Sequence, residues 1–152
     1  MTLGKLTEEQ IEGVLSNNSV GRIGCSDGQQ TYVVPVTYVY DGRHIIAHSI
    51  YGMKIRIMRS NPSVCFEVDE IESPLKWKSV IAWGTYQELR EERERMQAIS
   101  LFVEKFRRLP MSVTAHPPDI LNMKKPVIHS ESARAIIYRI ILDTKTGRFE
   151  NE

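Results

Sequence analysis

The sequence predicts a mainly β protein, a closed or partly closed antiparallel barrel of six strands with flanking helices. Six apolar, β-rich runs carry this prediction: 19–25, 31–40, 43–48, 63–69, 77–89 and 133–144. Asp27-Gly28 and Asp41-Gly42 are hairpin turn signals between early runs. No strands alternate with helices in the manner of a parallel sheet. The last run lies far along the chain, as expected if it completes a barrel begun near the N-terminus.

Composition places the chain among ordinary globular proteins. Its 152 residues are 41% hydrophobic and 26% charged, which fits one domain over 1–152 with a substantial core. A net charge of +1 argues against nucleic acid or an acidic membrane surface as a partner. The start lacks the order of a secretory signal, and no apolar run approaches a membrane span. Cys25 and Cys65 each lie within an apolar run, so we expect no disulfide framework and a cytoplasmic location.

Three helices are predicted. The first begins at a capping box, Thr7 to Gln10, and ends at Asn17-Asn18. Its expected buried stripe is Ile11, Val14 and Leu15. The second covers about 52–60, and the third covers 90–109, before Pro110. The third helix has an expected buried face of Met96, Ile99, Phe102, Val103 and Phe106, and 110–133 is predicted to be an irregular loop.

The junction between run 43–48 and helix 52–60 combines residue types that suit an anion. The first turn of a helix leaves backbone N–H groups unpaired, and the helix dipole favours negative charge there. Ser49 can donate a hydroxyl, Gly52 allows close approach of the backbone, and Lys54 supplies a point charge. The junction is therefore a candidate phosphate site.

Magnitudes decide whether such a site holds a ligand. The dipole contributes only about 0.3–1 kcal/mol, whereas each hydrogen bond to a charged group contributes about 1.5–3 kcal/mol. Two or three such hydrogen bonds are enough to bind a phosphate, and Arg56 and Arg59 add to the positive electrostatic field at the site. The alternative is a capped helix with solvated bases, and the residue types by themselves leave both interpretations open.

Two strands carry further candidate residues. Pro35 lacks an N–H group, so run 31–40 is predicted to lie at an edge or to contain a bulge. In run 77–89, Trp77 and Ser79 share one face and are candidates to border a ligand. Trp83, on that same face, is expected to be core.

Taken together, these stretches resemble the pyridoxamine 5′-phosphate oxidase-like superfamily of flavin-binding split barrels, nearest its nitroimidazole-resistance and flavin-nucleotide-binding branch. The motifs are VGRIGC (20–25), YVVPVTYVYDG (32–42), HSIYGMK (48–54), MRSNPSVCFEVD (58–69), WKSVIAWGTYQEL (77–89) and TGR (146–148). Their order and spacing are more specific than any one of them. The resemblance implies a six-stranded antiparallel split β-barrel of the FMN-binding type.

The resemblance also implies FMN as cofactor and a homodimer with each flavin near the subunit interface. By position, Ser49 and Lys54 would hold the phosphate, with the backbone at Gly52 and Met53. The flavin ring edge would be lined by the backbone at Val34, Pro35, Val36 and Thr37. From the long strand, or from that strand of the partner subunit, Trp77, Lys78 and Ser79 would flank the cofactor.

His48 is the one candidate catalytic residue, and it also belongs to the implied cofactor site. It can orient substrate, stabilise reduced flavin or ligate a haem iron, or it can be a hydrogen-bonded structural histidine. The other three histidines have no spacing typical of a metal site, and none is expected.

The expected function is an FMN-dependent oxidoreductase that takes electrons from NAD(P)H or another donor and reduces a small acceptor such as a nitroaromatic ring. One alternative is a protein that stores or senses flavin or haem without turnover, and another is a relative that uses the deazaflavin coenzyme. The substrate-phosphate arginines of pyridoxamine phosphate oxidases have no counterpart in the sequence, so the resemblance names no substrate.

Overall fold

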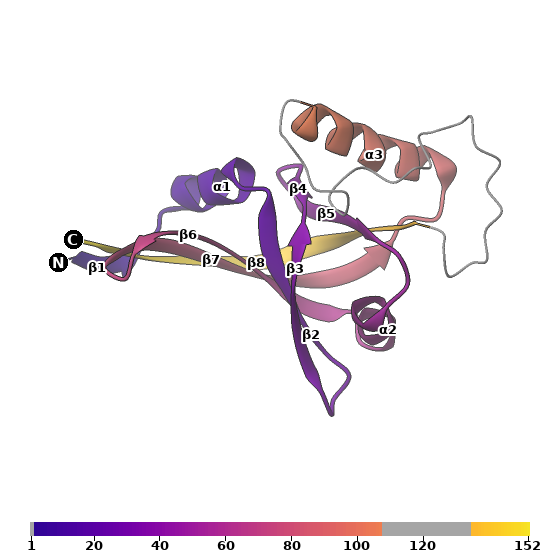
Figure 1. Cartoon of the computed structure of the whole chain (residues 1–152), viewed down its shortest axis with the longest axis horizontal. Coiled ribbons are helices and arrows are strands. Elements are labelled where there is room, and N and C mark those ends of the chain that lie inside the picture. Colours follow the sequence, from indigo (N-terminus) through magenta and orange to yellow (C-terminus); the bar gives the residue numbers. More distant parts are fainter. Residues whose placement is uncertain (1, 108–134) are drawn as a thin grey trace.

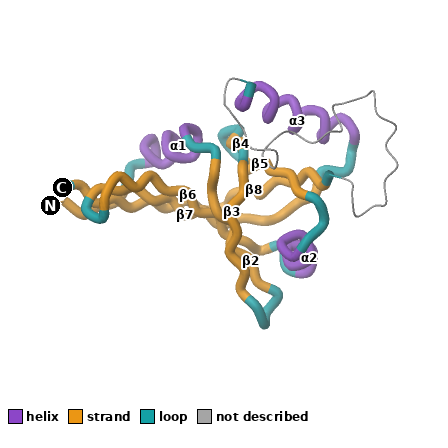
Figure 2. Tube along the Cα trace, in the orientation of Figure 1, coloured by secondary structure: helices purple, strands orange, loops and turns teal. Residues whose placement is uncertain are grey.

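A computed structural model describes residues 2–107 and 135–152 of the chain. The predictions for 108–134, including the irregular loop, lie outside the described residues. Figures 1 and 2 show a strongly curved sheet with helices around it and a narrow arm of strands that carries both chain termini. None of the helices in the described ranges is long and apolar enough to span a membrane.

One antiparallel sheet contains every described strand. The strands are β1 (Thr2–Lys5), β2 (Val20–Ser26), β3 (Thr31–Thr37), β4 (Val39–Tyr40), β5 (His44–Ser49), β6 (Ser63–Ser73), β7 (Lys76–Glu88) and β8 (Ile136–Asn151). Their order is β3-β2-β6-β7-β8-β5-β4, and β1 pairs with β8 beyond this path. The prediction of a mainly β, antiparallel fold is confirmed.

Tyr38 explains why the sheet curls into a barrel. The two strands at opposite ends of the order, β3 and β4, are separated in sequence by this residue alone. Its N–H donates to the carbonyl of Ser19 at 3.0 Å, and its buried hydroxyl donates to the carbonyl of Leu15 at 2.7 Å. The predicted run 31–40 therefore divides between two partner strands, β2 and β5.

The strand count differs from the prediction for two reasons. Run 31–40 divides at Tyr38, and β1 adds a short strand whose mostly exposed residues carry little apolar pattern. The last strand is also longer than expected, because Lys145 to Asn151 continue it along β7 and β1. The two hairpin predictions are confirmed, with positive φ at Gly28 (95°) and Gly42 (94°).

The first two helices follow the prediction closely. Helix α1 (Glu8–Asn17) begins with the predicted capping box: Thr7 Oγ1 accepts from the Gln10 N–H at 3.2 Å, and Gln10 Oε1 accepts from the Thr7 N–H at 2.8 Å. Its buried residues are Ile11, Val14 and Leu15, as expected. Helix α2 (Met53–Ser60) lies between β5 and β6 in the chain and buries Ile55, Ile57 and Met58.

Helix α3 (Glu92–Phe106) buries Ile99, Phe102 and Phe106 as predicted, but the edges of its buried stripe differ from the prediction. Its buried residues are Arg95, Ala98, Ile99, Phe102 and Phe106. Met96 and Val103 are wrong as core residues, since they are 39% and 40% exposed. The reason is the rotation of the helix about its own axis. The stripe centred on Ala98, Ile99 and Phe102 packs against Val39, Ile46 and Ile137 of the sheet, which leaves Met96 and Val103 at the sides.

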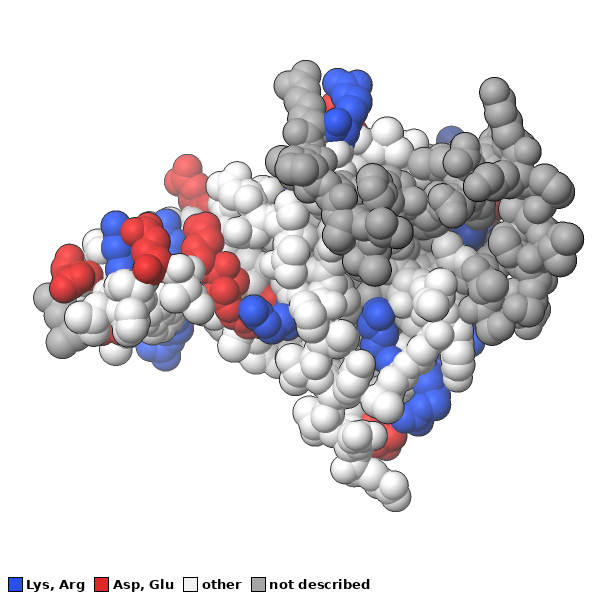
Figure 3. Space-filling model, viewed as in Figure 1, with Lys and Arg blue, Asp and Glu red and all other residues white. Residues whose placement is uncertain are grey.

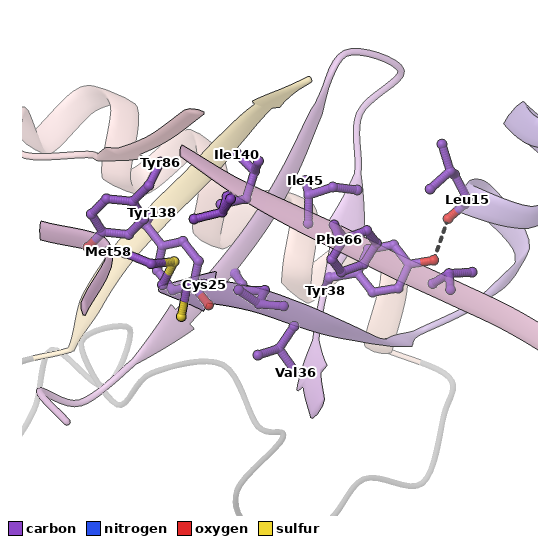
Figure 4. Packing of buried hydrophobic residues seen from close by; sticks show 14 of the residues in the cluster. Leu15, Cys25, Val36, Tyr38, Ile45, Met58, Phe66, Tyr86, Tyr138 and Ile140 are labelled. Atoms are coloured by element: carbon purple, nitrogen blue, oxygen red, sulfur yellow. Dashed lines mark hydrogen bonds between the residues drawn. The ribbon is translucent and has the colours of Figure 1, made fainter. Parts of the chain in front are cut away.

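The barrel interior holds the main core, part of which Figure 4 shows. Tyr38 and Phe66 pack edge to face at one end, with ring centroids 4.9 Å apart. Cys25, Met58 and Tyr138 meet at the other end, where α2 joins the barrel (Figure 4). Both cysteines are free, Cys25 buried and Cys65 half-buried. Trp83 is wrong as a core residue: it lies on the outer face of β7 and is 44% exposed, because Ala82 and Gly84 face the interior.

Lys105 connects α3 to Tyr38, the residue between β3 and β4. Its ammonium donates to the carbonyls of Asn18 at 2.6 Å and Tyr38 at 3.2 Å. It also lies over the ring of Tyr38, 4.7 Å from the centroid. Burial lowers the pKa of Lys105 to about 8. These contacts fix α3 beside β4 and β5, and so beside His48.

Candidate functional site

The junction from β5 to α2 is open at its centre. Gly52 is the N-cap of α2, and no side chain caps the helix there. The first helical bond runs from the Arg56 N–H to the Gly52 carbonyl at 3.0 Å. A Cβ placed on Gly52 would meet no atom within 4 Å, and its φ of −167° is extended backbone open to any residue. The glycine is therefore not required by the fold, and the space beside it can admit a ligand.

Lys54 is a half-buried cation in the first turn of α2. Within the described ranges, its ammonium makes neither an ion pair nor a hydrogen bond. Burial lowers the pKa of Lys54, and Cys25 nearby opposes the shift. A partly buried, uncompensated charge is unfavourable by itself. An anion at the start of α2 would compensate it.

The two arginines of α2 already have acidic partners. Arg56 lies 3.6 Å from the carboxylate of Asp27, and Arg59 donates to Glu88 at 2.5 and 3.3 Å. Figure 3 shows basic side chains over this part of the surface, with acidic side chains next to them. Arg56 and Arg59 therefore contribute less to an anion site than their charges suggest, and Lys54 contributes most.

Ser49 ends β5 and its hydroxyl has a local partner. Its Oγ donates to the carbonyl of Ile50 at 2.7 Å. A phosphate at this position requires the hydroxyl to rotate away from that carbonyl. Because the rotation is about one side-chain bond, the contact with Ile50 does not prevent the Ser49 hydroxyl from acting as a donor to a ligand.

His48 points toward α3 rather than into the barrel. Its ring packs edge-on against Phe102, with centroids 5.0 Å apart and an interplanar angle of 68°. Its Nε2 is buried and has no hydrogen-bond partner among residues 2–107 and 135–152. Burial lowers the pKa of His48, and the charge of Lys54 lowers it further. The structure therefore favours a neutral imidazole close to the anion site.

Val34 to Thr37 belong to β3, an edge strand. On one side β3 pairs with β2, where Pro35 faces Arg22, and in the described sheet no strand pairs with its other side. The edge position predicted for Pro35 is confirmed. Val36 is buried in the core, whereas the backbone along this edge remains available to a ligand.

The structure does not bring Trp77, Lys78 and Ser79 to the Lys54 site within one chain. Ser49 pairs with Ile136 at the start of β8, and Trp77 pairs with Glu150 at its end. Ile136 and Glu150 are fourteen positions apart along β8, roughly 45 Å if the strand were straight. The Trp77 indole donates to Glu150 at 3.1 Å, and the Ser79 hydroxyl donates to Glu67 at 3.1 Å.

A separate pocket lies on the arm. Its volume is about 460 Å³, and Leu6, Gln10, Trp77, Lys78 and Phe149 are among its lining residues. Trp77 and Lys78 line this pocket, whereas Ser79 is not among its lining residues. The predicted contact of all three residues with a cofactor stays a prediction. One site that contains both groups requires a second chain.

A group of exposed apolar side chains surrounds Gly52 and was not predicted from the sequence. Ile50, Tyr51 and Met53 are 65%, 44% and 45% exposed. Arg59 lies over the Tyr51 ring, 5.5 Å from its centroid. Large apolar residues in a loop beside a glycine were the available signal. The packing of His48 on Phe102 had no sequence signal, because it depends on where α3 docks.

These residues fit the phosphate end of a flavin cofactor. The open backbone at Gly52, the half-buried ammonium of Lys54, unpaired among the described residues, and the Ser49 hydroxyl supply complementary charge and donors. The free edge of β3 offers backbone groups of the kind that a flat polar ring can pair with. The charge and donors gathered here are therefore compatible with a cofactor that carries a phosphate.

Comparison with known proteins assigns the chain to a family. The sequence model of the family described as pyridoxamine 5′-phosphate oxidase matches residues 7–147, and the chain belongs to this family. An uncharacterized protein of Rhizobium meliloti is 38% identical over 104 residues, which is 66% of this chain and 69% of that protein.

Solved structures share the fold of the chain. An FAD-binding protein from Mesorhizobium loti matches with a TM-score of 0.73 and 31% identity, over 99% of this chain and 100% of that one. A candidate 5-nitroimidazole antibiotic resistance protein from Bacteroides thetaiotaomicron matches with a TM-score of 0.69 and 16% identity, over 98% and 89% of the two chains. The resemblance stated from the motifs is confirmed, and the fold is the split barrel of this family.

Proposed function

We propose that the chain is a flavoprotein that binds the FMN unit at the amino end of α2 and acts as an oxidoreductase on a small acceptor. The observation that carries this proposal is the half-buried ammonium of Lys54, unpaired within the described chain, beside the open backbone of Gly52. Membership of a family named for an oxidase, and the FAD-binding relative from M. loti, support it.

In this proposal each residue has a limited task. Lys54 and the first N–H groups of α2 neutralise the phosphate, and the Ser49 hydroxyl turns from Ile50 to donate to it. The free edge of β3, from Val34 to Thr37, orients the flavin ring. The flavin supplies the hydride and electron transfer chemistry, while the protein positions and tunes it.

We also propose that the active form is a homodimer. The Lys54 site and the Trp77, Lys78 and Ser79 group lie at opposite ends of β8 in one chain. A partner subunit can bring its own Trp77 group to the Lys54 site, which closes the side that one chain leaves open. The exposed apolar residues Ile81 and Trp83 on the outer face of β7 also favour burial against another chain.

The cheapest test of cofactor binding is the absorbance of the purified protein. A flavin spectrum, with release on heating of a compound that has the mass of FMN or of FAD, which contains the FMN unit, is the expected result. A released compound with the mass of the deazaflavin coenzyme would identify that coenzyme as the ligand in place of FMN. A colourless protein that also fails to bind added flavin in fluorescence titration would reject the proposal.

Turnover is tested separately from binding. The flavin-loaded protein is expected to bleach anaerobically with NADH or NADPH and to recover on addition of a nitroaromatic acceptor. If no pyridine nucleotide bleaches it, an electron-donor protein or a storage role takes the place of the NAD(P)H reductase.

The Nε2 of His48, which has no hydrogen-bond partner in the described part of the chain, favours a second candidate, haem binding, since a free imidazole nitrogen can serve as an axial ligand. The Phe102 ring packed on His48 opposes it, because a haem would have to displace α3. Haem titration decides: a shift of the Soret band that is lost in His48→Ala supports haem, and an unchanged free-haem spectrum rejects it.

A further inference from the structure

The loop before α2 exposes more apolar surface than an anion site needs. Ile50, Tyr51 and Met53 surround Gly52, and each has at least 44% of its surface exposed. The polar neighbours Ser49 and Lys54 lie immediately outside this group in the sequence. Exposed apolar residues that cluster beside a charged site indicate a ligand or partner with an apolar part.

Tyr51 is the member of this group whose position is fixed. The guanidinium of Arg59 lies over the Tyr51 ring at 5.5 Å from the centroid. Arg59 is itself held by two contacts to Glu88, at 2.5 and 3.3 Å. Glu88 in turn accepts from the Tyr86 hydroxyl at 2.8 Å and lies 3.4 Å from Arg90. A chain of contacts from β7 thus holds an exposed aromatic ring in a defined place.

A ring held by a cation and still exposed is a stacking platform for a flat aromatic group. Aromatic side chains bind nucleobases in this way, irrespective of base identity. The platform lies one residue before Gly52 and three before Lys54. A base that stacks on Tyr51 would therefore be joined to a phosphate at the amino end of α2 through a short connection, as in an adenylate.

We propose that Tyr51 stacks the adenine ring of FAD, so that this site prefers the dinucleotide flavin over FMN. The inference rests on the proposed function, because FAD contains the FMN unit that the Lys54 site would hold. The M. loti protein, similar over the whole of its length, is described as FAD-binding. A second copy of this chain is the other possible cover for the exposed loop, and the test below separates the two.

The experiment compares the dissociation constants of FMN and FAD for the apoprotein, measured by flavin fluorescence, in the wild type, Tyr51→Ala and Tyr51→Phe. The wild type is expected to bind FAD about tenfold more tightly than FMN, the size of one base stacking contact. Tyr51→Ala is expected to lose this preference while its FMN constant stays unchanged. Tyr51→Phe keeps the ring and is expected to keep the preference.

Arg59→Met provides an independent test, since it removes the cation that lies over the ring and keeps the Tyr51 side chain. It is expected to reduce the FAD preference partly, with circular dichroism confirming that the variant is folded. Equal FMN and FAD constants in the wild type would overturn the inference and leave the proposed function standing. If Tyr51→Ala weakens both flavins equally and shifts dimer dissociation in ultracentrifugation, a partner subunit covers the loop and the inference is wrong. If neither flavin binds the wild type, the proposed function fails as well.

Discussion

The ring of His48 lies edge-on against the ring of Phe102, with centroids 5.0 Å apart, so the residue at the end of β5 is covered by a helix more than fifty positions later in the chain. This contact places the candidate anion site and α3 in one packed unit. It also explains the low pKa of His48, because the imidazole is shielded from water on one side and has the Lys54 charge nearby. His48 therefore connects the cofactor site to the outer layer of the fold.

The burial of neutral His48 predicts a loss of stability in mild acid. Because its pKa is lowered on folding, the unfolded chain binds the proton more readily. The free energy of unfolding should therefore fall as pH drops below about 6.5, the ordinary pKa of histidine, and level off below the folded pKa. Urea unfolding of the apoprotein from pH 7.5 to 5 measures this.

His48→Gln serves as the comparison, since it removes the titration. It should flatten the pH dependence over this window, whereas a profile identical to that of the wild type would show that His48 is not its source. The protein concentration is held constant, because any dimerisation contributes to the apparent stability.

Lys54→Ala is expected to weaken flavin binding by about 1.5–3 kcal/mol, the scale of a hydrogen bond to a charged group. The loss follows from removal of the one ammonium of α2 that has no acidic partner in the described structure. Fluorescence titration of the apoprotein measures the dissociation constant.

Arg56→Ala is the matched control on the same helix, because Arg56 is exposed and already paired with Asp27. Its effect should stay below about 1 kcal/mol, as for other exposed ion pairs. Full flavin occupancy of Lys54→Ala after extensive dialysis would contradict the assignment of the phosphate to this site.

Two glycines should respond oppositely to the same substitution. A Cβ on Gly84 would lie 2.2 Å from the Ile141 carbonyl oxygen, at the irregularity where β7 pairs with β8. Gly84→Ala should therefore destabilise the protein by about 1–3 kcal/mol, as overpacking commonly does. Gly52→Ala meets no atom within 4 Å and should leave stability nearly unchanged while weakening flavin binding.

Thermal unfolding of both glycine variants measures the effect on stability, and flavin titration measures the effect on binding. Gly52→Ala with unaltered flavin affinity would mean that the ligand does not approach this backbone. A fully stable Gly84→Ala would mean that β7 and β8 can move apart locally.

Two buried tyrosines provide a second contrast. The Tyr38 hydroxyl donates to Leu15 at 2.7 Å, whereas the Tyr138 hydroxyl is buried without a partner in the described chain. Tyr38→Phe should cost about 0.5–1.5 kcal/mol, or more because the Leu15 carbonyl loses its donor. Tyr138→Phe should be neutral or stabilising, since it removes a polar group that burial penalises.

Urea unfolding of the two variants under identical conditions measures the difference. Equal destabilisation would show that the Tyr138 hydroxyl does have a partner in solution. If Tyr138→Phe alone lowered flavin affinity, the interior end of the barrel near Cys25 would be part of the site.

Local patterns determined much of this protein from the sequence alone. The capping box at Thr7, the hairpins at Gly28 and Gly42, the edge position of Pro35 and the strand-to-helix junction at Ser49 to Lys54 depend on neighbouring residues, so they are visible without a fold. The order of the motifs also identified the family. Tertiary structure alone decided that Trp83, Met96 and Val103 face outward, that Phe102 covers His48, and that Trp77 lies far from Lys54 within one chain. Each of these depends on how helices and strands dock across the barrel. The neighbours of an apolar residue in the sequence do not show whether its side chain will face the core or the outer surface.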